Sequence, residues 1–363
     1  MTIEELEADP HPLLARLRAS EPVAWVEPLG AWLVTSRELA LAAMRDAETF
    51  TVDDPRFSTA QVVGQSMLTR DGEEHARHRD PFARPFRLQP VRERFGDLVV
   101  EETDRLIDAF ADGRAELRRE LAGPLAVAVV AHALGLGLSR TGEVLAWYDA
   151  IVASVTGVAA GRPVTPEGAA AFAELRESLE PVLAGVHGLS ADEAASNFAV
   201  LMFGGIETTE GMIANALWHL LTHPAELALV RSDRSLLPNA VEESLRLEPA
   251  AAVIDRYATR DVSLGGAAIG RGEQVTISLA GANRDPAVFP DPDRFDVRRA
   301  NAKLHLAFAQ GPHVCIGMHL ARLEAHAAVG RLLDRLPGLS LERPTAPRGL
   351  VFRKPPELRV TWG

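Results

Sequence analysis

The sequence is poor in cysteine and lysine, and it contains no long apolar run. Cys315 is the only cysteine among 363 residues, which excludes an internal disulfide framework. No apolar stretch reaches the length of a membrane-spanning helix, and the acidic first twenty residues match neither a signal peptide nor a membrane anchor. We therefore expect a cytoplasmic protein with no membrane partner. The only lysines are Lys303 and Lys354, and a net charge of −12 argues against nucleic acid as a partner.

The overall composition is that of an ordinary globular protein, with 47% hydrophobic and 24% charged residues. The sequence shows no internal repeat, no low-complexity tract and no linker, so we predict one domain over residues 1–363. Hydrophobic periodicity favours helices along most of the chain. The predicted fold class is therefore mainly α with a smaller β part.

The hydrophobic pattern also places the individual elements. The predicted helices cover 36–50, 72–88, 90–111, 115–136, 141–157, 168–185, 190–222, 235–247 and 317–336. A hairpin is predicted at 23–36, and short strands are predicted over 250–280. Residues 51–70 lack periodicity and are predicted as a long loop, which is often functional in a compact domain. Residues 281–312, rich in proline, aspartate and asparagine, are predicted as an extended meander.

Cys315 lies in the stretch HLAFAQGPHVCIG, directly before a predicted helix. The dipole and free N–H groups of that helix favour a thiolate. Gly311 and Gly317 leave room for a flat group to approach the backbone, and Phe308 adds apolar surface. With no second cysteine, iron–sulfur clusters and structural zinc fit poorly, whereas haem iron with one axial thiolate fits well. From this loop alone, an inert buried cysteine and a Cys–His nucleophile using His313 remain open.

Residues 201–221, LMFGGIETTEGMIANALWHLL, are typical of a long buried helix that contains polar groups. Gly204 and Gly205 lie mid-helix, at a cost of about 1 kcal/mol each relative to alanine. Glu207 and Thr208 follow one turn later, and a threonine hydroxyl can bond the carbonyl one turn back. The resulting groove, beside an acid and an alcohol, can hold a small ligand and pass protons to it. A core helix with satisfied polar residues is the alternative.

Taken together, these segments resemble the cytochrome P450 family over essentially the whole chain. FAQGPHVCIG resembles the family's haem loop, GGIETT its oxygen-activation motif and ESLR its Glu-x-x-Arg helix. PDRF (292–295), EHARHR (74–79) and DRYATRD (255–261) resemble three further segments. The haem-loop motif is highly specific for the family, whereas Glu-x-x-Arg is informative only together with the other motifs. The loop departs from the family at Ala309, where glycine is common.

The resemblance implies a haem b cofactor between the Gly-Gly-x-Glu-Thr helix and the cysteine loop. Cys315 would be the thiolate ligand of the iron, and the propionates would lie in a cationic cluster. The implied cofactor-binding residues are Cys315, His75, Arg79, Arg256, His313, Phe308, Gly311 and Gly317. Glu207 and Thr208 would deliver protons to iron-bound dioxygen. The implied structural triad is Glu243, Arg246 and Arg294.

Substrate contacts can be placed only by position along the family's elements. They are expected on the helix above the haem, the strand after the Glu-x-x-Arg helix, the loop over 61–68 and the tail turn. The predicted substrate residues are Val200, Phe203, Gly204, Ala252, Val253, Ile254, Met67 and Val351. All are apolar or small, which favours a largely hydrophobic or amphipathic small molecule.

The implied activity is that of a monooxygenase of bacterial secondary metabolism. It would activate dioxygen to hydroxylate or epoxidise its substrate, with electrons from a ferredoxin and a ferredoxin reductase. A haem-thiolate oxidase that couples or closes rings in a natural-product or peptide precursor, without inserting oxygen, is the alternative. A haem protein that binds a ligand without turnover is a third hypothesis, and Glu207 and Thr208 argue against it.

Overall fold

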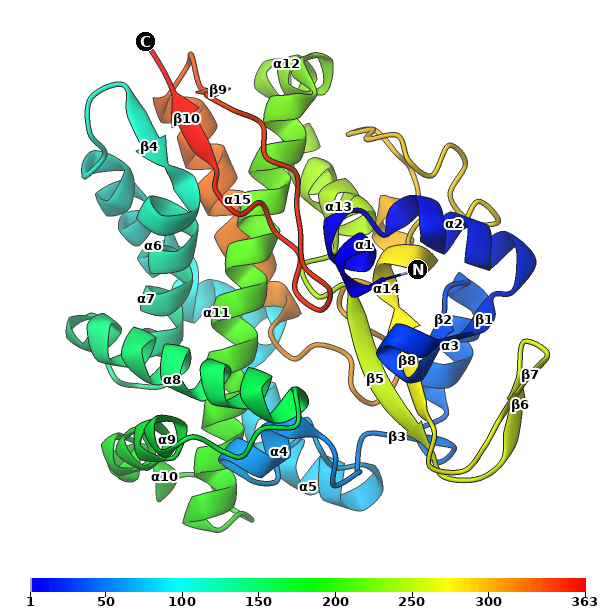
Figure 1. Cartoon of the computed structure of the whole chain (residues 1–363). Coiled ribbons are helices and arrows are strands. Elements are labelled where there is room, and N and C mark those ends of the chain that lie inside the picture. The colour runs from blue at the N-terminus through cyan, green and yellow to red at the C-terminus, as the bar shows by residue number, and fades with distance from the viewer. Residues whose placement is uncertain (1) are drawn as a thin grey trace.

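The helix α11 runs through the middle of the molecule and organises the rest of the fold. The computed structural model describes residues 2–363 of the chain. α11 spans Ala191–Thr222 and begins at a capping box, in which Ser190 and Glu193 satisfy each other's backbone N–H groups. Most of its residues are apolar and buried, because other elements cover it on nearly every side. In Figure 1 the green α11 separates helices on one side from the sheet and the N-terminal helices on the other.

Helices make up most of the remaining chain. Those before α11 are α1 (Ile3–Ala8), α2 (His11–Ser20), α3 (Arg37–Arg45), α4 (Ser58–Val63), α5 (Gly72–Ala83), α6 (Leu88–Asp108), α7 (Gly123–Ala133), α8 (Thr141–Ala159), α9 (Pro166–Ser178) and α10 (Glu180–Leu183). Those after it are α12 (Pro224–Ser232), α13 (Leu237–Leu247), α14 (Leu279–Ala282) and α15 (Met318–Arg335). No helix in the described part of the chain combines the length and apolar character that a membrane span requires.

The β part consists of one five-stranded sheet and two smaller ones. The large sheet has the order β1 (Val23–Val26), β2 (Ala31–Val34), β8 (Gln274–Ser278), β5 (Val253–Ala258) and β3 (Phe50–Thr51). β2 and β8 are parallel, and the other pairs are antiparallel. A second sheet has the order β4 (Arg114–Glu116), β10 (Arg359–Thr361) and β9 (Ser340–Leu341). β6 (Val262–Leu264) and β7 (Ala267–Ile269) form a separate hairpin.

The two largest hydrophobic clusters both include α11. One joins the second half of α11 to α6, α13 and α15, and the other joins its first half to α7, α8 and α9. A third cluster lies on the large sheet and packs against α3. Because one helix contributes to both major clusters, the helices on its two halves are held in a fixed relation to each other.

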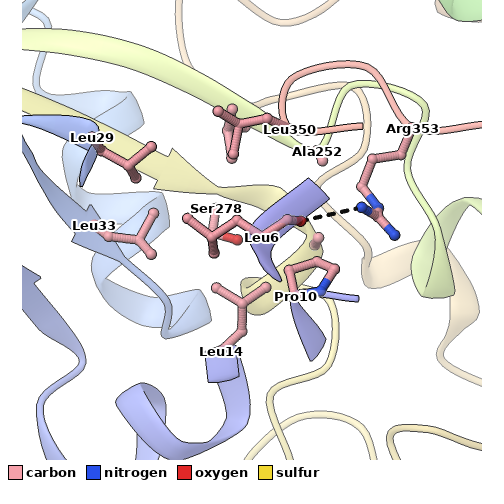
Figure 2. A pocket seen from close by; sticks show the side chains of 11 residues that line it. Leu6, Pro10, Leu14, Leu29, Leu33, Ala252, Ser278, Leu350 and Arg353 are labelled. Carbon is pink, nitrogen blue, oxygen red and sulfur yellow. Dashed lines mark hydrogen bonds between the residues drawn. The ribbon is translucent and has the colours of Figure 1, made fainter. Parts of the chain in front are cut away.

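The N-terminal helices close the outer face of the large sheet. Leu6 and Leu14 pack with Leu33 and Ala252 around a cavity of about 20 Å³, and Arg353 donates to the Leu6 carbonyl at 3.4 Å (Figure 2). This volume holds about one water molecule, so the cavity is a packing defect in the N-terminal contact. Ala252 was predicted to contact the substrate. It is only 2% exposed and belongs to this apolar cluster.

The predicted fold class is confirmed, and the predicted elements are mostly found. The main errors are the first residues of the predicted helix 115–136, which form β4 and a π-helical turn over Arg118–Ala122. β4 exists because β10, more than 240 residues later, supplies its hydrogen-bond partner. The sequence interpretation also missed α1, α2 and α12, as well as the short α4 within the predicted loop 51–70. α1 and α4, of six residues each, are too short for the hydrophobic period to identify them.

Candidate active site

Cys315 lies in a tight loop, three residues before the start of α15. Its backbone N–H donates to the Phe308 carbonyl at 2.8 Å, and the Val314 N–H donates to the Gly311 carbonyl at 3.2 Å. The thiol is exposed, yet it is surrounded by enough protein that burial raises its pKa. Backbone N–H groups of Gly317 and Met318 oppose this effect only in part. The predicted N–H donors are therefore present, and Arg79 and Arg322 also lower the pKa of the thiol, but burial outweighs all of these effects.

Glycine is required in this loop at Gly311 but not at Gly317. Gly311 has φ +78°, and an added Cβ would lie 2.4 Å from the Met44 carbonyl oxygen. Gly317 has a negative φ, and an added Cβ would lie 4.0 Å from the Cys315 sulfur. Ala309 adopts φ +55°, which explains why glycine suits this position in related loops.

The four residues predicted to bind the propionates form a cluster beside the cysteine loop. The rings of His75 and His313 lie 4.3 Å apart, and Arg79 donates to the Val314 carbonyl at 2.6 Å. Arg256 is 4% exposed, and its one hydrogen bond among the described residues goes to the Asp255 carbonyl at 2.7 Å. Buried cations that lack a carboxylate partner fit an anionic ligand.

The histidines of this cluster differ in their bonding. His313 Nε2 lies 2.7 Å from Asp71 Oδ1, and, although burial opposes the shift, hydrogen bonds from His313 and Thr51 lower the pKa of Asp71 to about 2. His75 Nε2 is buried and has no hydrogen-bond partner among residues 2–363. Burial, together with the neighbouring His313 and Arg79, lowers the pKa of His75 to about 4. An unpartnered buried nitrogen aimed into a cationic cluster is consistent with a propionate group as its partner.

The glycine pair in α11 serves two different purposes. An added Cβ on Gly205 would lie 2.6 Å from Val130 Cγ2, so this glycine allows α7 to approach α11 closely. An added Cβ on Gly204 would meet nothing within 4 Å, so the helix surface is open there. The Thr208 hydroxyl donates to the Gly204 carbonyl at 2.6 Å, as the sequence predicted. The open surface and the threonine hydroxyl therefore lie one turn apart on the same helix.

Glu207 is held by two residues that the sequence analysis did not identify. The Tyr148 hydroxyl on α8 donates to Glu207 Oε2, and Lys354 Nζ lies 2.8 Å from Glu207 Oε1. Tyr148 is 59 positions away along the chain, and Lys354 comes from the C-terminal tail. No local pattern links either residue to Glu207, although the scarcity of lysine could have drawn attention to Lys354.

The structural triad contains Arg299 in place of the predicted Arg294. Glu243 is fully buried and pairs with Arg246 Nε at 2.7 Å and with Arg299 Nε at 2.8 Å. Arg294 contributes only its backbone carbonyl, which accepts from both other arginines at 3.1 Å. The prediction was wrong because the chain turns after Phe295 and brings the later arginine back to Glu243.

The predicted substrate residues are only partly brought together. A cavity of about 640 Å³ is lined by Val253 and Val351, whereas Val200 and Met67 are buried in the packed interior. Phe203 packs edge-to-face against Phe352 at 5.6 Å. Gly204 is exposed, and Ile254 is half-buried and packs against the sheet cluster.

The large cavity also has a polar wall that the sequence analysis missed. Polar side chains on one face of β5 and β8 and on the 56–61 segment line it: Asp255, Tyr257, Gln274, Thr276, Arg56, Ser58 and Gln61. The Thr276 hydroxyl donates to Asp255 at 2.7 Å. Apolar residues that also line the cavity include Leu29, Leu350 and Val351. The cavity therefore suits an amphipathic molecule better than a purely hydrophobic one.

Comparisons with known proteins agree with this site. A family model described as Cytochrome P450 matches residues 176–344. The cytochrome P450 monooxygenase PikC of Streptomyces venezuelae is 36% identical, over 98% of this chain and 90% of its own. The structure of P450BioI in complex with an acyl carrier protein ligated to hexadec-9Z-enoic acid has a TM-score of 0.88 at 30% identity, over 98% of this chain and 99% of that one.

A third relative carries out a different reaction. The structure of CxnD, a cytochrome P450 for C–S bond formation in chuangxinmycin biosynthesis, has a TM-score of 0.87 at 29% identity. The match covers 99% of this chain and 95% of that one. The fold, the cysteine loop and the full-length similarity to PikC and P450BioI lead to one conclusion: the chain belongs to the cytochrome P450 family of haem-thiolate oxidoreductases.

Proposed function

We propose that Cys315 binds the iron of haem b as its only protein ligand. The observation that carries this proposal is an exposed sulfur on a glycine-containing loop, beside the buried Arg256 and the half-buried Arg79, neither of which pairs with a carboxylate, and beside the unpartnered His75 Nε2. When bound, the haem supplies the activation of dioxygen, and the thiolate favours cleavage of the O–O bond. Phe308 and Gly311 shape the loop, and Gly317 precedes the helix whose N–H groups face the sulfur.

The cationic cluster would hold the two propionates of the haem. Arg79 and Arg256 would supply charge-assisted hydrogen bonds, and His75 would use its unpartnered Nε2. His313 would contribute its remaining ring nitrogen, because Asp71 already occupies Nε2. Asp71 thereby orients His313, and Arg79 and Arg256 would supply the positive charge where the propionates would bind.

Glu207 and Thr208 would pass protons to the distal face of the haem, next to the open surface at Gly204. We expect Thr208→Ala to lower product formed per electron and to raise hydrogen peroxide, because the hydroxyl that orders the proton path is lost. Peroxide and product are measured together under steady turnover. An unchanged ratio of product to electrons would remove Thr208 from the proton path and favour a protein that binds ligand without proton delivery.

We propose that the substrate is a small amphipathic molecule of bacterial secondary metabolism, into which the enzyme inserts oxygen. The mixed wall of the 640 Å³ cavity supports this substrate class, and PikC supports the reaction. Coupling or ring closure without oxygen insertion is the second candidate, favoured by the similarity to CxnD. Turnover under ¹⁸O-labelled dioxygen separates the two. We expect the label in the product, and an unlabelled product would establish the second candidate.

Electrons would come from a ferredoxin and its reductase in the cytoplasm. Exposed arginines at the α5–α6 junction, Arg84, Arg87 and Arg92, offer a docking surface for an acidic ferredoxin. Arg92 lies close enough to His319, in the first turn of α15, to contribute to the lowering of that histidine's pKa. The surface therefore adjoins the cysteine helix. Reduction by an acidic ferredoxin should slow with rising salt and in Arg92→Glu, and a rate independent of salt would contradict this docking surface.

A further inference from the structure

The acid of α11 belongs to a chain of alternating charges and donors that crosses three elements. Lys354 Nζ lies between two carboxylates one helical turn apart, 2.8 Å from Glu207 and 2.7 Å from Glu210. Arg118 pairs with the far side of Glu210 at 2.7 Å, and Tyr148 occupies the far side of Glu207. Both oxygens of Glu207 therefore face donors within the protein.

These contacts are removed from bulk solvent. Tyr148 is 6% exposed, and the side chains of Glu207 and Lys354 are 17% and 14% exposed. Burial and the neighbouring Glu207 raise the pKa of Tyr148, so its hydroxyl remains a donor throughout the working pH range. A half-buried ion pair is screened by salt much less than a surface pair. The two contacts therefore fix the orientation of the Glu207 carboxylate.

The tail that carries Lys354 is rigidly placed. The Arg353 N–H donates to the Ala250 carbonyl at 2.9 Å, and Asn215 on α11 donates to the Arg353 carbonyl at 3.0 Å. The Lys354 carbonyl accepts from the Arg348 N–H at 3.0 Å, which closes a short hairpin. The tip of that hairpin, Leu350 and Val351, lines the large cavity. Lys354 therefore reaches Glu207 from the same segment that forms a wall of the candidate substrate site.

The choice of lysine at this position is itself informative. The chain has two lysines among 38 lysine and arginine residues, and the other, Lys303, is exposed. A compact ammonium can bridge two carboxylates one turn apart, whereas the planar guanidinium of arginine is built to engage one carboxylate with two parallel hydrogen bonds. Lys354 is therefore an exception in a sequence that uses arginine for almost all of its cations, and it is the residue that contacts the candidate proton donor Glu207.

We propose that Lys354 and Tyr148 are positioning residues for Glu207, which hold its carboxylate in orientation through one contact to each oxygen and so control how it passes protons toward Thr208. The inference rests on the proposed proton-delivery role of Glu207 and Thr208. Five charged or titratable groups surround the carboxylate and share in this control: Lys354 from the tail, Glu210 on α11, Arg118 in the π-helical turn, and Tyr148 and Asp149 on α8. Removing the ammonium favours the neutral carboxyl, so protons would be delivered up to a higher pH.

The direct test follows the protonation of Glu207 in the haem-loaded protein without turnover. The carboxyl C=O infrared band is recorded against pH and assigned by its loss in Glu207→Gln. We expect Lys354→Met to move the midpoint of this titration up by about one pH unit, the effect of removing one opposite charge at this distance. Lys354→Arg keeps the positive charge and should therefore leave the midpoint close to its wild-type value. Lys303→Met, at the exposed lysine, should leave the midpoint unchanged. An unmoved midpoint in Lys354→Met would reduce the ion pair to a structural contact.

Tyr148→Phe provides the variant that keeps the fold, because it removes only a hydroxyl. It should move the midpoint in the same direction by a smaller amount, and a shift in the opposite direction would contradict the proposed role of Tyr148. The second readout is the fraction of consumed dioxygen that leaves as hydrogen peroxide, measured against pH with a surrogate reductase. Its pH dependence should move in parallel with the infrared midpoint. A midpoint that moves without this parallel change would overturn the proposed control of proton delivery.

Failure of the underlying function gives a different result. If Glu207→Gln leaves the peroxide fraction of haem-loaded protein unchanged at every pH, Glu207 is not in the proton path and the proposed function loses that step. If Glu207→Gln changes the peroxide fraction while Lys354→Met and Tyr148→Phe do not, Glu207 remains in the proton path. The proposed positioning role of Lys354 and Tyr148 is then contradicted.

Discussion

At the scale of single residues, the candidate site contains buried polar groups that have fewer hydrogen-bond partners than buried groups usually have. His75 has an unpartnered buried nitrogen, and the buried Arg256 has only a backbone carbonyl as partner among the described residues. Glu243, by contrast, has two arginines and is fully buried. Beside the cysteine loop, such groups fit an anionic ligand, whereas the fully paired Glu243 holds the fold together.

Arg299, and not Arg294, should carry the stability of the buried triad. Arg299→Met leaves Glu243 buried with one cation fewer, which should lower the free energy of unfolding by about 3–5 kcal/mol. Arg294→Met is the matched control and should change it by less than about 0.5 kcal/mol, because the side chain is exposed. Denaturant unfolding of both variants measures the difference. Equal losses would show that the Arg299 side chain is not a member of the triad.

The cysteine loop should tolerate a methyl group at Gly317 far better than at Gly311. Gly311→Ala adds a left-handed alanine and a clash with the Met44 carbonyl, which together should cost roughly 2–4 kcal/mol. Gly317→Ala meets no atom closer than 4.0 Å and should cost less than about 1 kcal/mol. Thermal unfolding of the two variants tests this order, and a reversed order would contradict the loop geometry.

At the scale of elements, α11 joins the two major clusters and carries the candidate proton donors on one turn. Its packing against α13 includes the buried His219, which accepts or donates at 2.9 Å to the Ser244 hydroxyl and stacks on Phe295 at 5.0 Å. Burial lowers the pKa of His219 to about 3. The neutral imidazole is therefore part of the α11–α13 contact.

This contact gives the protein a defined sensitivity to acid. Because the folded pKa of His219 lies below its ordinary value of about 6.5, its contribution is present above pH 6.5 and is lost as the pH falls toward 3. Between pH 6.5 and 3 the free energy of unfolding should fall more steeply in the wild type than in His219→Gln. The difference should reach up to about 1.4 kcal/mol per pH unit. Denaturant titrations between pH 7 and 4 measure the two slopes. Identical slopes would show that His219 does not control this loss.

Sequence reasoning worked best where the physics is local. The helix α11 and the hairpin before α3 each depend on the pattern of neighbouring residues, and both are found as expected. It failed where partners are distant in the chain. Arg294 was predicted as the third member of the triad, where the structure has Arg299, and the contacts of Lys354 and Tyr148 with Glu207 were missed. The polar lining of the large cavity was missed because the faces of β5 could not be assigned before its pairing with β8 was known.

At the scale of the whole molecule, the fold brings His75 and Arg79 of α5 beside the cysteine loop, from which they are more than 230 residues away along the chain. The family, the fold and the arrangement of cations all lead to one central claim, that Cys315 is the thiolate ligand of a haem. Every other assignment, from the propionate cluster to the proton path, depends on it.

The absorption spectrum of the reduced protein with carbon monoxide tests this claim most directly. The wild type should show the strongly red-shifted Soret band of thiolate-ligated haem, and Cys315→Ser should lose it. A band typical of imidazole ligation in the wild type, or an unchanged red-shifted band in Cys315→Ser, would show that Cys315 is not the ligand.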